Sequence, residues 1–218
     1  MKEIYGNLWE IPCDLRVITT NGDTNRRTGA AVMGRGCAKE TTERISDIQF
    51  HFGKLLRRHG NRVMRLTSPA RKGWALASFP VKHHWHEEAD LPLIRRSAHQ
   101  LVALADKFGY RDVLLPRPGC GNGRLSWEDV KPVLGEILDD RFTVVTFPPK
   151  GAKWRVVRES QRSFNTGDTN ETVIASNLSE EQAQARAGRE NRLARRAGAL
   201  AHHRVEPVPP RPQEGGRP

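Results

Sequence analysis

Short apolar runs alternate with helical patterns over the first 150 residues, and this alternation constrains the fold most. Strand-like runs include Arg16–Thr20, Trp74–Val81 and Asp112–Leu115. They are apolar on both faces, as strands buried between two layers of helices are. The pattern therefore predicts an α/β fold: a three-layer α/β/α domain with a mixed, mostly parallel sheet.

Helix signals support the same arrangement. Apolar residues recur on one face of Leu91–Phe108, and Gly109 follows as a C-cap. Ser126 is expected to cap a helix that runs to Leu138, with Asp129 three residues into it. The remaining predictions are one or two helices within 32–57 and strands over 62–66 and 142–147.

The composition changes after Pro148 and Pro149. We expect residues 1–148 to form one domain. Residues 149–206 are expected to form a small C-terminal module, α+β or helical, with one long helix over about 179–199. Residues 207–218 are rich in Pro and Gly, a composition typical of disorder.

Charge and cysteine usage limit the function classes. The chain has 36 Lys and Arg against 25 Asp and Glu, a net charge of +11. Such a field attracts the phosphates of a nucleotide or of nucleic acid, although an Arg-rich solvated surface has the same composition. The sequence contains no run of about 18 apolar residues, so no membrane span is expected. Cys13, Cys37 and Cys120 lack CxxC spacing, which favours reduced thiols in a cytoplasmic protein and argues against a metal site. No cofactor is expected.

Three unusual loops directly follow predicted strands, beginning at Asn21, Lys82 and Gly119. The carboxyl ends of parallel strands share one edge of a sheet, and ligands bind there. We therefore expect the three loops to form one site. The oligomeric state has no signal in the sequence.

The first loop, which begins at Asn21, is rich in glycine. Gly29, Gly34 and Gly36 permit positive φ and close approach of a ligand to the backbone. Free N–H groups that open a helix there make an anion cradle, and Arg35 adds positive charge. A plain glycine-rich turn has the same residues, and the loop lacks the lysine of a P-loop.

The second loop, Pro118–Trp127, has glycines at Gly119, Gly121 and Gly123 and leads into the helix capped by Ser126. One such loop is weak evidence for phosphate binding. Two loops, each after a buried strand, favour a nucleotide diphosphate over a purely structural role.

The third segment, Phe79–His86, reads FPVKHHWH. Lys82 can place a charge against a phosphate or ribose oxygen, or polarise a leaving group. The three histidines can shuttle protons. The alternative is an exposed polar loop with Trp85 packed beneath it.

Taken together, these blocks resemble the macrodomain family over roughly residues 1–148. The matching blocks are the Asn21 region, GAAVMGRGCA, FPVKHHWH and LPRPGCGNGRLSWEDVKP. The chain is most similar to the branch of the DarG-type DNA ADP-ribosyl glycohydrolases and the terminal ADP-ribose glycohydrolases. The resemblance implies a three-layer fold that binds ADP-ribose, and hydrolysis of ADP-ribose from modified DNA or protein.

The resemblance also assigns residues. It implies that Asn21 contacts the distal ribose and that Lys82 acts in catalysis. Gly123 stands where the terminal glycohydrolases carry an aspartate, so a non-catalytic ADP-ribose reader is the alternative. The catalytic candidates are Lys82 and Asn21, and the ligand-binding candidates are Asn21, Gly29, Val32, Met33, Gly34, Gly36, Pro118, Gly119, Cys120, Gly121, Asn122 and Gly123.

A basic nucleic-acid-binding protein is a third interpretation. The predicted C-terminal helix places several arginines on one face, although a solvated helix has the same pattern. The partners expected are thus ADP-ribose or an ADP-ribosylated substrate, with nucleic acid as a further candidate and no membrane. The arginines concerned are Arg186, Arg189, Arg192, Arg195 and Arg196.

Overall fold

The computed structural model describes residues 1–68, 73–147, 154–161, 169–196 and 201–208. The chain divides into two compact units, Met1–Thr146 and Phe147–Pro218, and each is described by itself.

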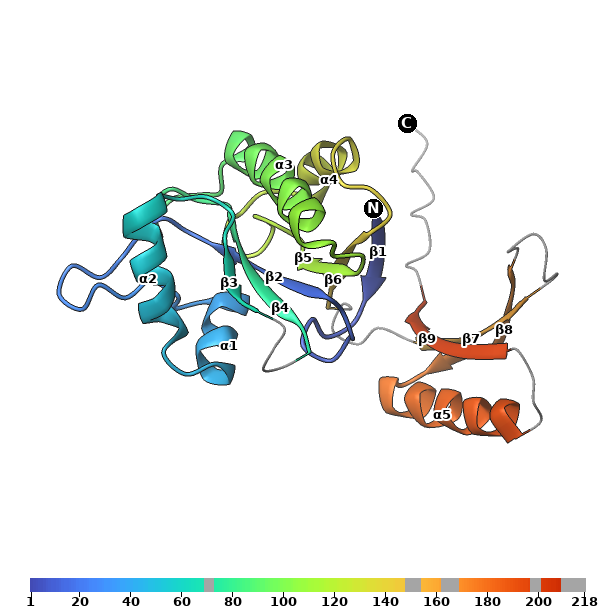
Figure 1. Cartoon of the computed structure of the whole chain (residues 1–218). Coiled ribbons are helices and arrows are strands. Elements are labelled where there is room, and N and C mark those ends of the chain that lie inside the picture. The colour runs from blue at the N-terminus through green and yellow to red at the C-terminus, as the bar shows by residue number, and fades with distance from the viewer. Residues whose placement is uncertain (69–72, 148–153, 162–168, 197–200, 209–218) are drawn as a thin grey trace, which may run out of the picture. The chain divides into compact units, whose positions relative to one another are not determined.

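A six-stranded sheet forms the centre of the first unit, with the strand order β1-β6-β5-β2-β4-β3 (Figure 1). Each neighbouring pair is parallel except β3 with β4. The predicted mixed, mostly parallel sheet is therefore confirmed. The strands are β1 (Lys2–Tyr5), β2 (Leu15–Thr20), β3 (Arg65–Thr67), β4 (Ala75–Pro80), β5 (Val113–Pro116) and β6 (Phe142–Thr146).

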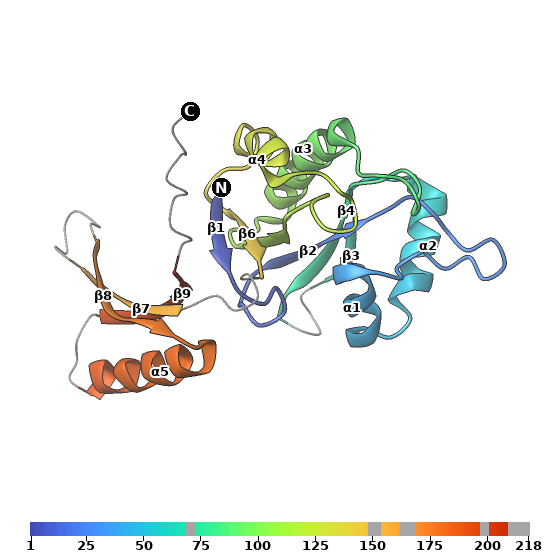
Figure 2. The same cartoon turned by 180° about the vertical axis from the view of Figure 1, so that it is seen from behind.

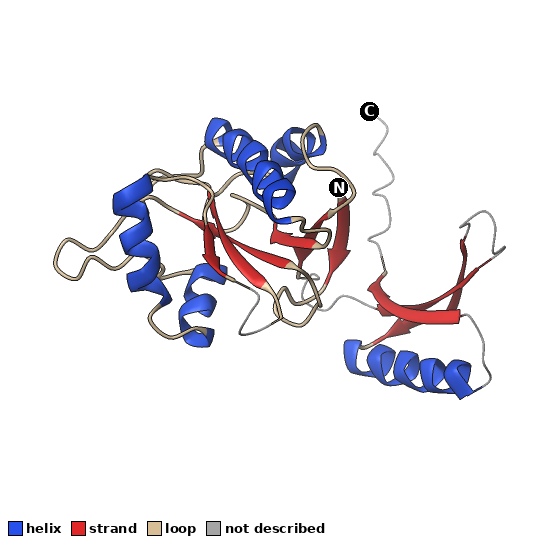
Figure 3. Ribbon diagram, in the orientation of Figure 1, coloured by secondary structure: helices blue, strands red, loops and turns tan. Residues whose placement is uncertain are grey.

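Helices cover both faces of this sheet (Figure 3). One core lies between the sheet and α1 and α2, and includes Ile18 and Phe52. The other lies between the sheet and α3 and α4, and includes Leu101 and Phe142. The first unit is thus a three-layer α/β/α fold. Its helices are α1 (Gly36–Arg44), α2 (Ile48–His59), α3 (Leu91–Phe108) and α4 (Trp127–Gly135).

The helix ends follow from local chemistry. α3 has the predicted bounds because Gly109 takes the left-handed conformation, with φ of 69°, and ends it. The Ser126 hydroxyl accepts from the Asp129 backbone N–H at 3.2 Å and donates to the Asp129 carboxylate at 2.7 Å. This cap starts α4, which ends at Gly135, before the predicted Leu138.

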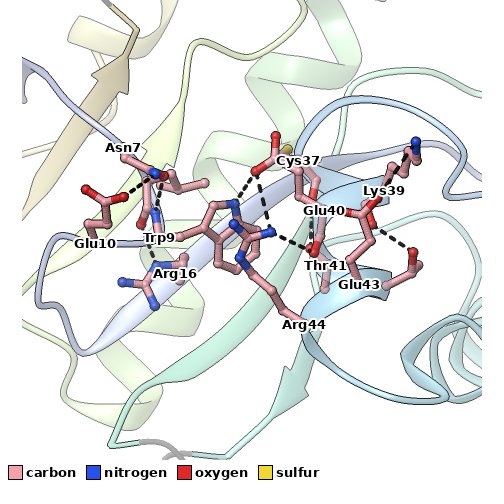
Figure 4. Close-up of polar contacts among 12 residues, drawn as sticks. Asn7, Trp9, Glu10, Arg16, Cys37, Lys39, Glu40, Thr41, Glu43 and Arg44 are labelled. Atoms are coloured by element: carbon pink, nitrogen blue, oxygen red, sulfur yellow. Dashed lines mark hydrogen bonds and ion pairs between the residues drawn. The ribbon is translucent and has the colours of Figure 1, made fainter.

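A buried arginine anchors the segment between β1 and β2 near the amino end of β2 (Figure 4). The Arg16 guanidinium donates to the carbonyl of Leu8 at 2.6 Å and lies over the rings of Trp74 (4.4 Å) and Trp9 (5.7 Å). The Trp9 indole N–H in turn donates to the carboxylate of Glu40 on α1. Burial lowers the pKa of Arg16, and the two rings partly offset the lost hydration.

The second unit is a three-stranded antiparallel sheet with one helix. Its strand order is β8-β7-β9. Val156 of β7 is buried with Ala183 and Ala187 of the helix. Residues 197–199 of the predicted helix, and residues 209–218 of the predicted disordered tail, lie outside the described residues. The elements are β7 (Trp154–Gln161), β8 (Thr169–Leu178), α5 (Glu180–Arg196) and β9 (Ala201–Pro207).

The described residues contain no membrane-spanning helix, no metal-ligand set and no disulfide. None of the described helices has the length and apolar character needed to cross a bilayer. Within the described ranges, no three His, Cys, Asp or Glu side chains lie together as a metal-ligand set. Cys13, Cys37 and Cys120 are free thiols.

Candidate functional site

Three loops leave the carboxyl edge of the sheet in the first unit, because β2 pairs in parallel with both β4 and β5. Asn122 links them. Its carbonyl accepts from the Lys82 ammonium at 2.7 Å, and its side-chain nitrogen lies 3.6 Å from the Cβ position of Gly36. The structure thus brings together Lys82, Asn122 and Gly36, the first residue of α1 after the loop that begins at Asn21. The loops comprise residues 21–35, 81–90 and 117–126.

Lys82 is half-buried at this junction. Burial, and then the positive charges of Arg124 and Arg35, lower its pKa, against a smaller opposing effect of Glu88. Its backbone carbonyl accepts from the Asn61 side chain at 2.8 Å, which fixes the start of the loop. An ammonium in this position is less hydrated than a surface lysine and gives up its proton more readily.

Asn21 shapes the base of the first loop. Its amide nitrogen donates to the carbonyl of Val32 at 2.9 Å, and its amide oxygen accepts from the Asp23 backbone N–H at 2.9 Å. Asp23 and Val32 are also joined directly, since the Val32 N–H donates to the Asp23 carbonyl at 2.9 Å. A primary amide has a second N–H and a second lone pair, and these remain to meet a ligand.

Asp23 connects the first loop to the loop of residues 81–90. One carboxylate oxygen lies 2.9 Å from Nδ1 of His84, and the other accepts from the Trp85 backbone N–H at 2.8 Å. Burial raises the pKa of Asp23, but these hydrogen bonds outweigh it and the net shift is downward. The hydrogen bond to Asp23 raises the pKa of His84. Trp85 is 57% exposed, so the expectation that it packs beneath the loop is wrong: the bond to its N–H leaves the indole in solvent.

The first glycine loop has mixed roles. Gly36 needs its flexibility, because its φ is 56° where α1 begins. α1 has no side-chain cap, so its first N–H groups can meet an anion. Gly34 is open, with no atom within 4 Å of its Cβ position. Met33 is buried in the core beneath α2, whereas the carbonyl of Gly29 accepts from Arg57 of α2.

The second glycine loop is closely packed. A Cβ on Gly123 would lie 2.3 Å from the carbonyl oxygen of Gly119 and 2.7 Å from the Cβ of Ala89. The loop therefore has no space for the aspartate of the terminal glycohydrolases. Pro118 is buried, and burial raises the pKa of the Cys120 thiol to about 11. That thiol stays protonated at neutral pH.

Comparison with known proteins gives sequence relatives for this unit. No family model matches the chain. The chain is 27% identical over 143 residues to a DNA ADP-ribosyl glycohydrolase of Thermus aquaticus, which covers 64% of the chain and 38% of the relative. It is 26% identical over 144 residues to a DNA ADP-ribosyl glycohydrolase of Mycobacterium tuberculosis, which covers 63% and 41%. The chain thus spans about two fifths of the length of the curated relatives it matches.

Solved structures are similar over the same region. The macrodomain of Mycobacterium tuberculosis DarG has a TM-score of 0.56 and 25% identity, and covers 67% of this chain and 97% of its own. The macrodomain of Thermus aquaticus DarG has a TM-score of 0.54 and 25% identity, and covers 68% and 97%. The first unit therefore has a macrodomain fold and is similar in sequence and structure to the macrodomains of DarG.

At the carboxyl edge of the sheet, the first unit thus presents the half-buried ammonium of Lys82, the amide of Asn21 and the open N–H groups at the start of α1. The ammonium suits an anion or a developing negative charge, and the amide suits hydroxyl groups. Among the predicted residues, the structure brings Gly36, Lys82 and Asn122 together at this junction.

Residues that hold the macrodomain loops were missed by sequence reasoning. Asn61 fixes the carbonyl of Lys82, and Arg57 fixes the carbonyl of Gly29. Each partner lies more than 20 residues away along the chain. Asn61 directly follows Gly60, which ends α2, and a residue after a helix end carries no local signal for such a contact.

Proposed function

We propose that this macrodomain binds ADP-ribose at the carboxyl edge of its sheet and hydrolyses the bond that joins ADP-ribose to modified DNA. The observation that carries the proposal is Lys82, a half-buried ammonium of lowered pKa held 2.7 Å from the Asn122 carbonyl between two glycine loops. DNA is preferred over protein because both sequence relatives are named DNA ADP-ribosyl glycohydrolase.

Binding rests on the two glycine loops. The uncapped start of α1 at Gly36 supplies N–H groups and a partial positive charge for the diphosphate. Asn21 uses its remaining N–H and lone pair on the hydroxyls of the distal ribose. Holding the diphosphate and the ribose at separate points orients the bond that is cut, and remote binding energy thereby lowers the barrier.

Hydrolysis breaks the bond between the anomeric carbon of the distal ribose and the atom that carries it. Water adds its hydroxyl to that carbon, and the leaving group takes a proton. In this proposal Lys82 stabilises the negative charge that develops on the leaving group, or supplies the proton, for which its lowered pKa suits it.

Lys82→Ala is the direct test. Wild type is expected to release ADP-ribose from an ADP-ribosylated single-stranded oligonucleotide, whereas the variant is expected to release it at least about a hundredfold more slowly. Calorimetry with free ADP-ribose is expected to give similar affinities for both proteins. Lys107→Ala is the matched control, because Lys107 is an exposed lysine in the last turn of α3, which leads to the amino end of β5, away from the loops at the carboxyl edge.

Two outcomes would contradict the proposal. A wild-type protein that does not bind ADP-ribose would overturn it entirely. A wild-type protein that binds ADP-ribose but releases none from DNA or protein would leave a non-catalytic reader. Gly123 favours that second candidate, since the packed loop cannot hold an acid that would assist Lys82.

A further inference from the structure

The loop between β2 and α1 contains a structured projection, residues 22–31, which we call the arginine hairpin. Thr24 and Ala31 form an antiparallel bridge. The Asn25 N–H donates to the Ala30 carbonyl at 2.7 Å, and the Gly29 N–H donates to the Asn25 carbonyl at 2.7 Å. Figures 1 and 2 show this loop, in blue, projecting beyond α2. The segment therefore has a defined shape.

Its base is fixed to the macrodomain. The Ala31 N–H donates to the Gln49 carbonyl at 2.8 Å, and the Arg57 guanidinium donates to the Gly29 carbonyl. Gly53 of α2 lets the hairpin approach closely, because any side chain there would collide with the Gly29 carbonyl. The tip is consequently held at a set position relative to α2.

The tip carries two arginines that the fold does not use. Arg26 and Arg27 are exposed, and no carboxylate of the described residues lies within ion-pair distance of either guanidinium. The Asn25 side chain accepts from the backbone N–H of Arg27 at 2.9 Å, so the turn is shaped while the charges stay free. Guanidinium groups bind phosphate oxygens with two parallel hydrogen bonds.

An exposed aromatic ring lies next to the hairpin base. The Asp23 carboxylate, at that base, accepts from the backbone N–H of Trp85, and 57% of Trp85 is in solvent. The acids that follow it are engaged: Glu87 accepts from the His84 N–H at 2.9 Å, and Glu88 pairs with Arg124 at 3.3 Å. Cations beside an exposed indole are typical of surfaces that bind single-stranded nucleic acid.

We propose that the arginine hairpin and Trp85 bind the single-stranded nucleic acid that carries the ADP-ribose. Arg26 and Arg27 contact backbone phosphates, and an unpaired base stacks on Trp85. The assignment rests on the proposed function, in which Lys82 faces the group attached to the distal ribose. Trp85 lies three residues after Lys82, in the same loop of residues 81–90. An acidic peptide would match the arginines but would leave the indole unused.

The test removes the two tip charges with Arg26→Ala/Arg27→Ala. The matched control is Lys2→Ala/Arg111→Ala, which removes two exposed charges near the amino end of the same sheet. Fluorescence anisotropy measures binding of an ADP-ribosylated single-stranded oligonucleotide over a range of salt. The slope of log K against log salt is expected to fall by about 1.4 in the hairpin variant, about 0.7 for each phosphate that is no longer neutralised, and to stay unchanged in the control.

Trp85→Ala tests the stacking separately. Affinity for the oligonucleotide is expected to fall about tenfold with an unchanged salt slope, because stacking involves no counterions. Trp85→Phe is expected to restore most of the loss. Free ADP-ribose is expected to bind all variants as it binds wild type, by calorimetry.

Equal salt slopes in the hairpin and control variants would overturn the assignment, as would a loss confined to an acidic ADP-ribosylated peptide. Failure of the wild type to bind ADP-ribose would instead overturn the proposed function. Normal ADP-ribose binding with an unaltered slope would refute the hairpin alone.

Discussion

Replacing Gly123 with alanine places a methyl group where the second loop has no space. The new Cβ would lie 2.3 Å from the Gly119 carbonyl oxygen, 2.7 Å from Ala89 Cβ and 2.8 Å from the Gly119 carbonyl carbon. Ordinary contacts of a Cβ start near 3.4 Å. The neighbours are backbone atoms and a Cβ, which cannot rotate away, so the loop must move by about 1 Å.

The cost follows from that movement. Overpacking a close-packed site costs about 1–3 kcal/mol. The shift also strains the hydrogen bond from the Ala89 N–H to the Gly123 carbonyl (2.9 Å) and that from the Leu125 N–H to the Gly119 carbonyl (3.1 Å). Each contributes about 1 kcal/mol. We expect the free energy of unfolding to fall by about 2–4 kcal/mol and the Tm of the macrodomain by roughly 5–15 °C.

Scanning calorimetry of Gly123→Ala beside Gly121→Ala checks this. Gly121 lies in the same loop, with no atom within 4 Å of its Cβ position, so its variant is expected to melt within about 1 °C of wild type. Equal Tm values for the two variants would refute the packing argument. So would Gly123→Asp if it raised the rate of ADP-ribose release without lowering the Tm.

Two further predictions follow from the pKa shifts. Asp23→Asn is expected to lower the pKa of His84 toward its ordinary value, measured by NMR titration of the ring, because the hydrogen bond to Asp23 and the charge of Asp23 raise it most. Any stability from that pair is full below about pH 6.5 and is lost as pH rises through the raised pKa, and an unshifted His84 in wild type would contradict the pairing. Iodoacetamide is expected to modify Cys120 slowly at neutral pH in the native protein, since its pKa of about 11 leaves little thiolate. Mass spectrometry before and after unfolding measures this, and rapid modification of the native thiol would count against a protonated Cys120.

Much of the fold is readable from the sequence where local signals agree. The α3 bounds follow from a one-sided apolar pattern and the cap at Gly109, and the central strands follow from runs that are apolar on both faces. β1 (Lys2–Tyr5) is absent from the prediction. All four of its residues are exposed, and it is a strand only because it pairs with β6 at the edge of the sheet.

The meeting of the three loops at one edge of the sheet was predictable, but the contacts between them were not. Parallel strands bring their carboxyl ends to one edge, so the three loops could be placed from their order alone. The contacts that shape them join distant residues: Asp23 and His84 are 61 positions apart, and Lys82 and Asn122 are 40 apart. Residue type and spacing carry no information on which polar group meets which across such distances. The misplacement of Trp85 has this cause.

The arginine hairpin separates its anchors from its tip. Asp23, Gly29 and Ala31 make the contacts to the rest of the macrodomain, whereas the hydrogen bonds of the described tip residues 25–28 stay within the hairpin. The side chains of the tip can therefore be changed without disturbing the contacts that hold the hairpin. The two arginines can be replaced with other charges, or with a fluorophore beside the binding edge, while the hydrophobic core and the glycine loops stay as they are.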